Sequence, residues 1–452
     1  MTDKDGKVTG YEYDGLYRLT KASYPDGSVT TYTYDGVGNR LAMNGVNYSY
    51  DVADRLLQAE ATTYGYDANG NMVSKVEAGE TTNYAYDYAN RLTSVGCGLS
   101  SIIYNYDGYG RRISRLVNGS GFGIPEAEKT DYFWDGTNVL LEFYQNKGNP
   151  LEYIYGNGQL ISRDDLLVLP VSKRLVYQNS YWFHQDGLGS VVNLTNSTGT
   201  VKLLYGYDAF GEITKEEGQV GWKKNRYTFT GKPYDQEVGM YYFGARWYEE
   251  EAGRFVTKDP CQANVFIPIN LNKYTYCYNN PTTWIDPFGE RALTAEEWRK
   301  IYAAYVLLYQ IGYPDAVIYY QEKNISEGGI DWIRKGGHVE FEIVPELPAG
   351  EAQAVPLKWW PSMIQIKEST FSGASISELA ALIAHENYHL MHPFSTFVNE
   401  SASYAIQYVI AKKLGLTNLA EIIKEKAMKR ELRINPKEWE KDVKKFRKNI
   451  NR

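Results

Sequence analysis

The sequence predicts a mainly β region followed by an α+β region, with the change near residue 290. Most of the 41 tyrosines lie before residue 280, in a part of the chain that is also rich in glycine, asparagine, aspartate and threonine. The later part is rich in alanine, leucine, lysine and glutamate at helical spacing. At 452 residues the chain is too long for one ordinary core, and we expect three segments, 1–175, 176–290 and 291–452.

The tyrosines of the first segment recur in the motif Tyr-x-Tyr-Asp. In the regular stretch the copies are roughly 16 to 21 residues apart, a repeat length that indicates stacked units. Residues two apart on a strand face the same side, so the paired tyrosines should form aromatic ladders on one face of a sheet. The copies are Tyr11/Tyr13/Asp14, Tyr32/Tyr34/Asp35, Tyr48/Tyr50/Asp51, Tyr64/Tyr66/Asp67, Tyr84/Tyr86/Asp87 and Tyr104/Tyr106/Asp107, with a variant at Tyr132/Trp134/Asp135 and a later copy at Tyr205/Tyr207/Asp208.

Each motif leads into a turn, such as residues 35–41 with the sequence Asp-Gly-Val-Gly-Asn-Arg-Leu. Asp and Gly supply the turn conformations, and Arg-Leu begins the return strand. The repeats therefore predict a β-sheet that is extended one hairpin at a time.

These motifs resemble the YD repeats of Rhs proteins, of insecticidal toxin-complex C components and of teneurins, over about residues 8 to 290. The second segment resembles the Rhs-associated core, and His184 within it is expected to be structural. The resemblance implies a hollow β-shell around a variable C-terminal toxin. It also implies as partners the rest of a larger Rhs shell, a protein substrate in the target cell and a cognate immunity protein. The core-like residues are 183–190, 207–212, 229–235, 239–242, 245–248 and 253–255.

Two Asp-Pro pairs, which begin at Asp259 and Asp286, stand at the end of the core-like block. Taken from the residues alone, such dipeptides indicate turns. In the family that this segment resembles, matching aspartates form a self-cleaving aspartyl protease. The resemblance therefore implies that these two carboxylates share a proton, one acting as acid and the other as base. Arg254 could orient one of them.

The family's cleavage follows its Asp-Pro-x-Gly motif, which corresponds here to residues 286–289. Glu290 and Arg291 stand after the motif, where the family usually has a hydrophobic residue. We therefore expect the scissile bond somewhere between Gly289 and Leu293.

His385, Glu386 and His389 form the sequence His-Glu-x-x-His on a segment with helical periodicity. Residues four apart lie on one helix face, so both imidazoles can point at a single zinc ion (Zn2+). Glu386 lies one step round the helix, where it can touch a zinc-bound water without binding the metal. The pattern predicts the metal site of a zinc hydrolase, with Glu386 as general base.

The residues around this motif fit the same interpretation. Ser375 and Glu378 have capping-box spacing at the start of a helix expected over 375–391, and residues 363–367 alternate like a strand. A strand, a loop and a zinc helix in this order resemble zincin peptidases. A second helix is expected over 396–414.

Zinc with two histidines needs a third protein ligand and an open position for water. Glu400, on the following helix, is the ligand that we expect, as in the gluzincin group, which this part resembles. His392 is the alternative. An oxyanion stabiliser is also required, and Tyr404, Tyr408 and His392 are all possible.

Composition narrows the functional classes. The formal net charge of −7 argues against a general nucleic-acid binder, and the basic stretch 424–452 interleaves acids and bases like a solvated helix face. The three cysteines suit neither a disulfide framework nor a zinc site. We see no transmembrane run and no signal peptide, so export is expected by a specialised route.

These observations together predict the end of an Rhs-type toxin that carries and releases a zinc-dependent peptidase for a target cell. Two alternatives stay open. One is a structural or surface-binding repeat protein without an active toxin, and the other is a toxin whose basic C-terminal helix acts on nucleic acid.

Overall fold

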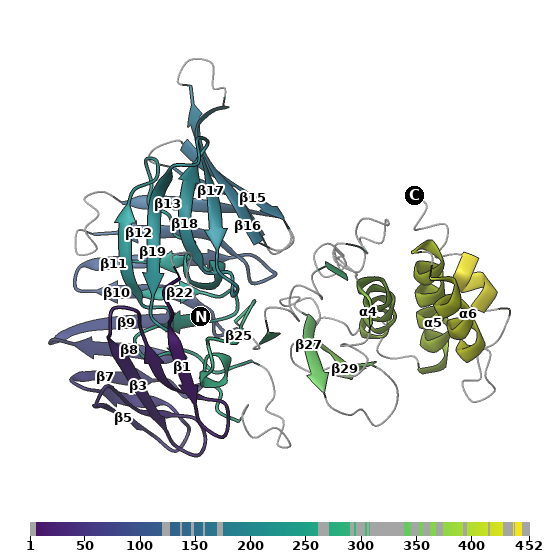
Figure 1. Ribbon diagram of the computed structural model, residues 1–452, viewed down its shortest axis with the longest axis horizontal. Coiled ribbons are helices and arrows are strands. Elements are labelled where there is room, and N and C mark those ends of the chain that lie inside the picture. Colours follow the sequence, from purple (N-terminus) through teal and green to yellow (C-terminus); the bar gives the residue numbers. More distant parts are fainter. Residues whose placement is uncertain are drawn as a thin grey trace. The chain divides into compact units, whose positions relative to one another are not determined.

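The computed structural model contains two compact units, Met1–Ala295 and Glu296–Arg452 (Figure 1). In the first unit the structure describes residues 6–119, 127–135, 138–145, 149–156, 159–169, 175–260, 271–289 and 293–294. In the second it describes residues 303–304, 307, 339–344, 352–355, 362–367, 374–391, 396–414, 416–427, 437 and 439–444. Only the backbone is described for residues 293–294, 339–344, 352–355, 362–367, 385–391, 396–403, 418 and 425–426.

In the described part of the first unit, 20 strands form one sheet in which each strand pairs antiparallel with the next along the chain. Figure 1 shows these strands succeeding one another through the unit, from purple to teal. The hairpin-by-hairpin sheet predicted from the repeats is confirmed. β16 belongs to the first predicted segment and nearly all of β17 to the second. These two strands pair with each other, so both segments contribute to one sheet.

The first ten strands are β1 (Gly10–Tyr13), β2 (Leu19–Ser23), β3 (Val29–Tyr34), β4 (Arg40–Met43), β5 (Val46–Tyr50), β6 (Leu56–Ala59), β7 (Thr62–Tyr66), β8 (Met72–Glu77), β9 (Glu80–Tyr86) and β10 (Leu92–Cys97). The next ten are β11 (Ser100–Tyr106), β12 (Arg112–Asn118), β13 (Glu128–Asp135), β14 (Asn138–Tyr144), β15 (Asn149–Gly156), β16 (Gln159–Val168), β17 (Leu175–Gln185), β18 (Val191–Asn196), β19 (Val201–Tyr207) and β20 (Ile213–Gly218).

The two tyrosines of a repeat make different interactions. From the second copy to the sixth the first tyrosine is buried, as Tyr32 is. The second tyrosine donates its hydroxyl hydrogen to a carbonyl of the preceding hairpin: Tyr34 to Leu19 at 2.8 Å and Tyr106 to Leu92 at 2.7 Å. These bonds tie a repeat to the hairpin before it. The same bond is made by Tyr50, Tyr86 and Tyr207.

The aspartate of each repeat closes the turn that follows. At Asp51 one carboxylate oxygen accepts the N–H groups of Ala53 at 2.9 Å and Arg55 at 3.0 Å. The other oxygen pairs with the guanidinium of Arg55. An aspartate that binds its own backbone two residues on stabilises a turn, which explains why the motif ends in this residue.

The core-like segment adds a small sheet and several short elements. Its strands are β21 (Tyr234–Asp235), β22 (Met240–Tyr242), β23 (Trp247–Glu249) and β24 (Arg254–Phe255), and its 3-10 helices are η2 (Phe229–Gly231) and η4 (Cys277–Asn279). β25 (Trp284–Ile285) pairs with β26 (Leu293–Thr294).

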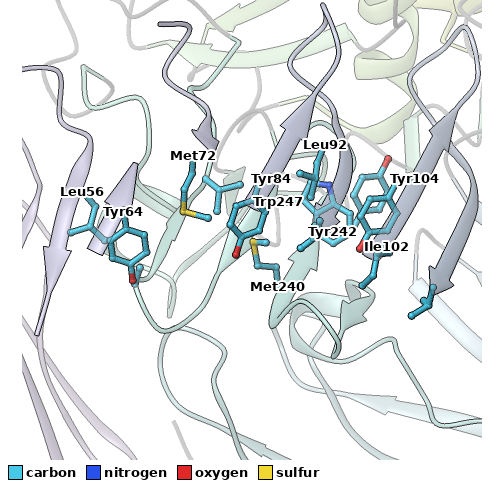
Figure 2. Close-up of a cluster of buried hydrophobic side chains, with 14 of the residues drawn as sticks. Leu56, Tyr64, Met72, Tyr84, Leu92, Ile102, Tyr104, Met240, Tyr242 and Trp247 are labelled. Atoms are coloured by element: carbon cyan, nitrogen blue, oxygen red, sulfur yellow. The ribbon is translucent and has the colours of Figure 1, made fainter. Parts of the chain in front are cut away.

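This small sheet packs on the tyrosine face of the large one. Figure 2 shows Met240, Tyr242 and Trp247 beside buried residues of β6 to β11, including Tyr84 and Tyr104. The rings of Tyr104 and Trp247 have centroids 4.9 Å apart. Burial of several such rings, each worth about 1.5–3 kcal/mol, holds the core segment against the sheet.

The second unit combines a three-stranded sheet with helices. β29 (Ser362–Lys367) pairs in parallel with β27 (Val339–Val344) and antiparallel with β28 (Ala352–Val355). The helices are α4 (Ile376–Met391), α5 (Thr396–Lys413) and α6 (Thr417–Ala427). No helix among the described residues is both long enough and apolar enough to cross a membrane.

The predicted strand and both predicted helices of this unit are confirmed. The capping box at the start of α4 is present, since Ser375 N–H donates to the Glu378 carboxylate at 2.8 Å and Glu378 N–H donates to Ser375 Oγ at 3.2 Å. α4 contacts β28, β29 and α5, with Leu379 and Ile383 buried.

Candidate functional site

Asp286 is a buried carboxylate at the end of β25, 2% exposed. Its Oδ1 accepts the N–H groups of Phe288 at 3.3 Å and Gly289 at 2.8 Å, which curls the chain into a tight turn. Gly289 has φ +75°, and an added Cβ would lie 2.9 Å from the Cβ of Phe243. The turn therefore requires glycine, both for its conformation and for the close approach of the 243–246 segment.

Arg246 joins the two predicted aspartates. It lies in the turn between β22 and β23, and its Nη2 is 3.3 Å from Asp259 Oδ2 and 3.2 Å from Asp286 Oδ2. Because both oxygens contact one nitrogen atom, they can be no farther apart than the two contact lengths together. The structure thus brings Asp259 and Asp286 into one site, although they are 27 positions apart in the chain.

The same guanidinium also holds the chain that leads out of the site. Arg246 Nε donates to the carbonyl oxygen of Gly289, and Nη1 donates to the carbonyl of Lys273 at 3.3 Å. Its carbon centre lies 3.6 Å from the centroid of the Phe255 ring, which shields it from water. Arg246 is itself 3% exposed, so its charge acts in a low-dielectric setting where it is strongest.

Arg254, the arginine predicted to orient an aspartate, has another place. Its Nη2 donates to the carbonyl of Asp54 in a repeat turn, and its guanidinium lies 4.9 Å from the ring centroids of Tyr50 and Tyr274. These contacts are with a turn and a strand of the large sheet and with Tyr274, whereas Arg246 contacts both aspartates. Arg246 reaches the two aspartates from the β22–β23 turn.

Lys232 is a second basic residue at this site that the sequence did not reveal. Its Nζ donates to the carbonyl oxygen of Pro287 and lies 5.6 Å from the centroid of the Phe243 ring. Burial lowers the pKa of Lys232 to about 8, and the nearby charge of Asp286 acts against that shift. Burial likewise raises the pKa of the Cys277 thiol well above its usual range, which makes this neighbour a poor nucleophile.

The predicted zinc residues lie on the two packed helices of the second unit. His385, Glu386 and His389 are in α4, and Glu400 is in α5. The side chains of these four residues are not among those that the structure describes, and His392 lies outside the described residues. Among the side chains that are described, no group of three His, Cys, Asp or Glu residues could hold a metal.

The two candidate tyrosines of α5 are placed differently. Tyr404 is half-buried, whereas Tyr408 is buried with its ring centroid 5.3 Å from that of Trp439. The packing of Tyr408 against a tryptophan is typical of a core residue.

Residues 1–282 match the family described as Teneurin YD-shell, which covers more than half of the chain. The chain belongs to the YD-shell family. The resemblance predicted from the tyrosine repeats is thereby confirmed, and the 20-stranded sheet is this protein's YD-shell segment.

Named relatives share this part of the sequence. The tRNA nuclease WapA of Bacillus subtilis (strain 168) is 35% identical over 294 residues, which are 64% of this chain and 11% of WapA. The double-stranded DNA deaminase toxin A of Burkholderia cenocepacia (strain H111) is 26% identical over 302 residues, 62% of this chain and 21% of the toxin. The crystal structure of TcdB2-TccC3 superposes with a TM-score of 0.37 at 17% identity, over 64% of this chain and 19% of that one.

This YD-shell chain therefore spans roughly a tenth to a fifth of its relatives' length. Residues 283–452 lie beyond the family match, and they include Asp286 and the whole second unit.

Proposed function

We propose that the YD-shell segment cleaves its own chain just after Asp286-Pro287-Phe288-Gly289 and so releases the second unit as an enzyme. The observation that carries this proposal is the shared contact of Asp259 and Asp286 with Arg246 Nη2. The guanidinium that contacts both carboxylates keeps them near one another and offsets part of their mutual repulsion. A pair of neighbouring carboxylates, one of which takes up a proton, is what an aspartyl protease uses.

The reaction follows from this geometry. One carboxylate takes a proton from water, and the water oxygen attacks the carbonyl carbon of the scissile bond. The other carboxylate, protonated at the start, gives its proton to the departing nitrogen as the C–N bond breaks. The bond is predicted between Gly289 and Leu293, and the hydrogen bond from Arg246 to the Gly289 carbonyl holds the chain at that point.

For the released unit we propose a zinc-dependent peptidase. One support is that α4 runs without a break through residues 385–389, which puts His385 and His389 on one helix face. The other is that α4 contacts α5, the helix that carries Glu400. Zinc bound there would polarise a carbonyl and acidify a water. Glu386 would accept the water proton and pass it to the leaving amine.

A nucleic-acid-directed effector is the second candidate. The named relatives include a tRNA nuclease and a DNA deaminase toxin, so their shells accompany enzymes that act on nucleic acid. Because the effector varies while the shell persists in these relatives, the histidine motif is the feature that favours a peptidase here. Delivery to a target cell by a specialised route and a cognate immunity protein belong to the same proposal.

The experiment that separates these candidates uses the full chain. Wild type and Glu386→Gln are expressed in a susceptible cell, and growth, protein cleavage and nucleic-acid integrity are followed. A peptidase predicts growth inhibition with protein cleavage and intact nucleic acid, lost in Glu386→Gln. Degraded or deaminated nucleic acid in both strains would support the second candidate.

A further inference from the structure

Three successive carbonyl groups of the Asp-Pro-Phe-Gly segment are each bound by a donor of the core-like segment. Pro287 accepts from Lys232 Nζ, Phe288 accepts from the N–H of Ala245 at 2.9 Å, and Gly289 accepts from Arg246 Nε. The N–H groups of Phe288 and Gly289 are bound on the other side by Asp286. The main chain of 287–289 is therefore held on both sides, in the manner of a bound peptide.

The fit around this segment is close. Gly244 has φ +99°, and a Cβ there would lie 3.1 Å from the carbonyl oxygen of Phe288. At Gly289 an added Cβ would lie 3.0 Å from the backbone nitrogen of Arg246. Both approaches are tighter than ordinary van der Waals contacts, so the segment packs closely against residues 243–246.

Lys232 differs from the other two donors because it comes from a separate element. It follows η2 directly, where its N–H donates to Phe229 O at 2.9 Å and its carbonyl accepts from Thr228 N–H at 3.0 Å. The ammonium thus extends from a backbone fixed at both ends. Its attraction to Asp286 and its place over the Phe243 ring direct it to the Pro287 carbonyl.

We propose that Lys232 is a positioning residue for self-cleavage: its ammonium fixes the Pro287 carbonyl and so sets the register in which the following bond meets Asp259 and Asp286. This rests on the proposed self-cleavage. A displacement of about 1 Å in a reacting group costs up to roughly 100-fold in rate. Loss of the hydrogen bond from Lys232 to Pro287 would allow such a displacement, while the Arg246 contacts with both carboxylates remain.

The test follows the first-order rate of self-cleavage of the full chain in a cell-free translation system, by pulse-labelling and denaturing gels. Lys232→Met removes the donor and keeps the length of the side chain, and Lys232→Arg keeps a charged donor. Lys202→Met, on the exposed face of β19, is the matched control. Thermal unfolding of each chain, made with Asp286→Asn to prevent cleavage, shows whether it folds.

We expect Lys232→Met to slow cleavage about 10- to 100-fold, Lys232→Arg to stay within about threefold of wild type, and Lys202→Met to have no effect. Wild-type cleavage by a folded Lys232→Met chain would overturn the inference. Equal slowing in the methionine and arginine chains would do so as well, since size rather than donation would then matter. If instead Asp259→Asn and Asp286→Asn chains still cleave, the proposed aspartyl mechanism fails, whatever the Lys232 results.

Discussion

The aspartates of the YD turns and Asp286 of the proposed cleavage site make the same local hydrogen bonds. Asp51 and Asp286 each use Oδ1 to accept two backbone N–H groups from residues just ahead in the chain. They differ in the other oxygen. Asp51 pairs with Arg55, four residues away and partly exposed, whereas Asp286 pairs with Arg246, a buried residue 40 positions away that also contacts Asp259.

Under the proposed self-cleavage, the same kind of turn would serve structure at Asp51 and chemistry at Asp286. A turn aspartate whose partner is local and solvated is held ionised by short-range hydrogen bonds. At Asp51 burial raises the pKa, but the bonds from Arg55 and Ala53 outweigh it and leave the pKa below its usual value. A turn aspartate that is placed beside a second carboxylate acquires the means to share a proton.

The largest expected effect separates these two classes directly. Asp286→Asn and Asp259→Asn should each abolish self-cleavage, because either change removes one half of the acid–base pair. Asp51→Asn should cleave normally. Asparagine keeps the Oδ1 acceptor, as Asn196 shows by accepting the N–H of Thr200 at 2.9 Å in an equivalent turn.

Rates of fragment appearance on denaturing gels measure this contrast. Cleavage that continues in both site variants would mean that a separate protease cuts the chain.

In the second unit the comparison is between Glu386, a carboxylate proposed to act without binding zinc, and the proposed zinc ligands. Glu386→Gln should retain zinc and lose orders of magnitude in effector activity, whereas His385→Ala and His389→Ala should lose the zinc itself. Glu400→Ala should weaken zinc strongly and His392→Ala weakly. Metal content of the purified full chain and toxicity in cells are the two measurements, and a reversed order for the last two variants would give the third position to His392.

Substitutions of Arg246 and Arg254 should have effects of intermediate size. Arg246→Met should slow self-cleavage about 100-fold or more, because both aspartates and the Gly289 carbonyl lose their shared partner. Arg254→Met should leave the cleavage rate close to wild type and lower the free energy of unfolding by about 1–3 kcal/mol through lost contacts with Tyr50 and Tyr274. Cleavage kinetics and urea unfolding measure the two effects. Equal slowing of cleavage in both variants would contradict the distinct role given to Arg246.

The smallest effect compares two turn aspartates. Burial raises the pKa of Asp208 to about 6 from a usual 3.8, so the folded protein binds this proton more tightly than the unfolded chain. The contribution of Asp208 to stability therefore falls as pH rises from about 4 to about 6 and stays low above that range. Asp208→Asn should raise the free energy of unfolding by about 1–2 kcal/mol at pH 7.5 and change it little at pH 4.

Asp51→Asn should do the opposite, since a lowered pKa contributes stability above pH 4 that is lost in acid. Urea unfolding at the two pH values checks both variants. A uniform effect of either substitution across pH would contradict the explanation from burial.

Local patterns accounted for most of the fold. The Tyr-x-Tyr-Asp spacing predicted the strands, the turns and the shared tyrosine face, because each depends on residues within one repeat. The capping pair Ser375 and Glu378 and the apolar spacing likewise predicted α4.

The site was only partly predictable, because it depends on residues that are far apart in the chain. Asp259 and Asp286 could be selected by their motifs. Arg246, in the β22–β23 turn, contacts both aspartates, and Lys232, next to η2, contacts the Pro287 carbonyl. These are tertiary contacts, which no local sequence pattern predicts. The role of Arg254 stays a prediction; its described side-chain contacts are with a repeat turn and with Tyr50 and Tyr274. The zinc ligands stay a prediction, since the described residues give only the helices that carry them.

The most direct test is the intact mass of the products formed by the full chain after synthesis in a protease-free translation system. Self-cleavage by the aspartate pair predicts two products whose masses place the cut between Gly289 and Leu293, and a single uncut mass for Asp286→Asn. A cut elsewhere in the chain, or the same two products from Asp286→Asn, would contradict the proposed role of this site.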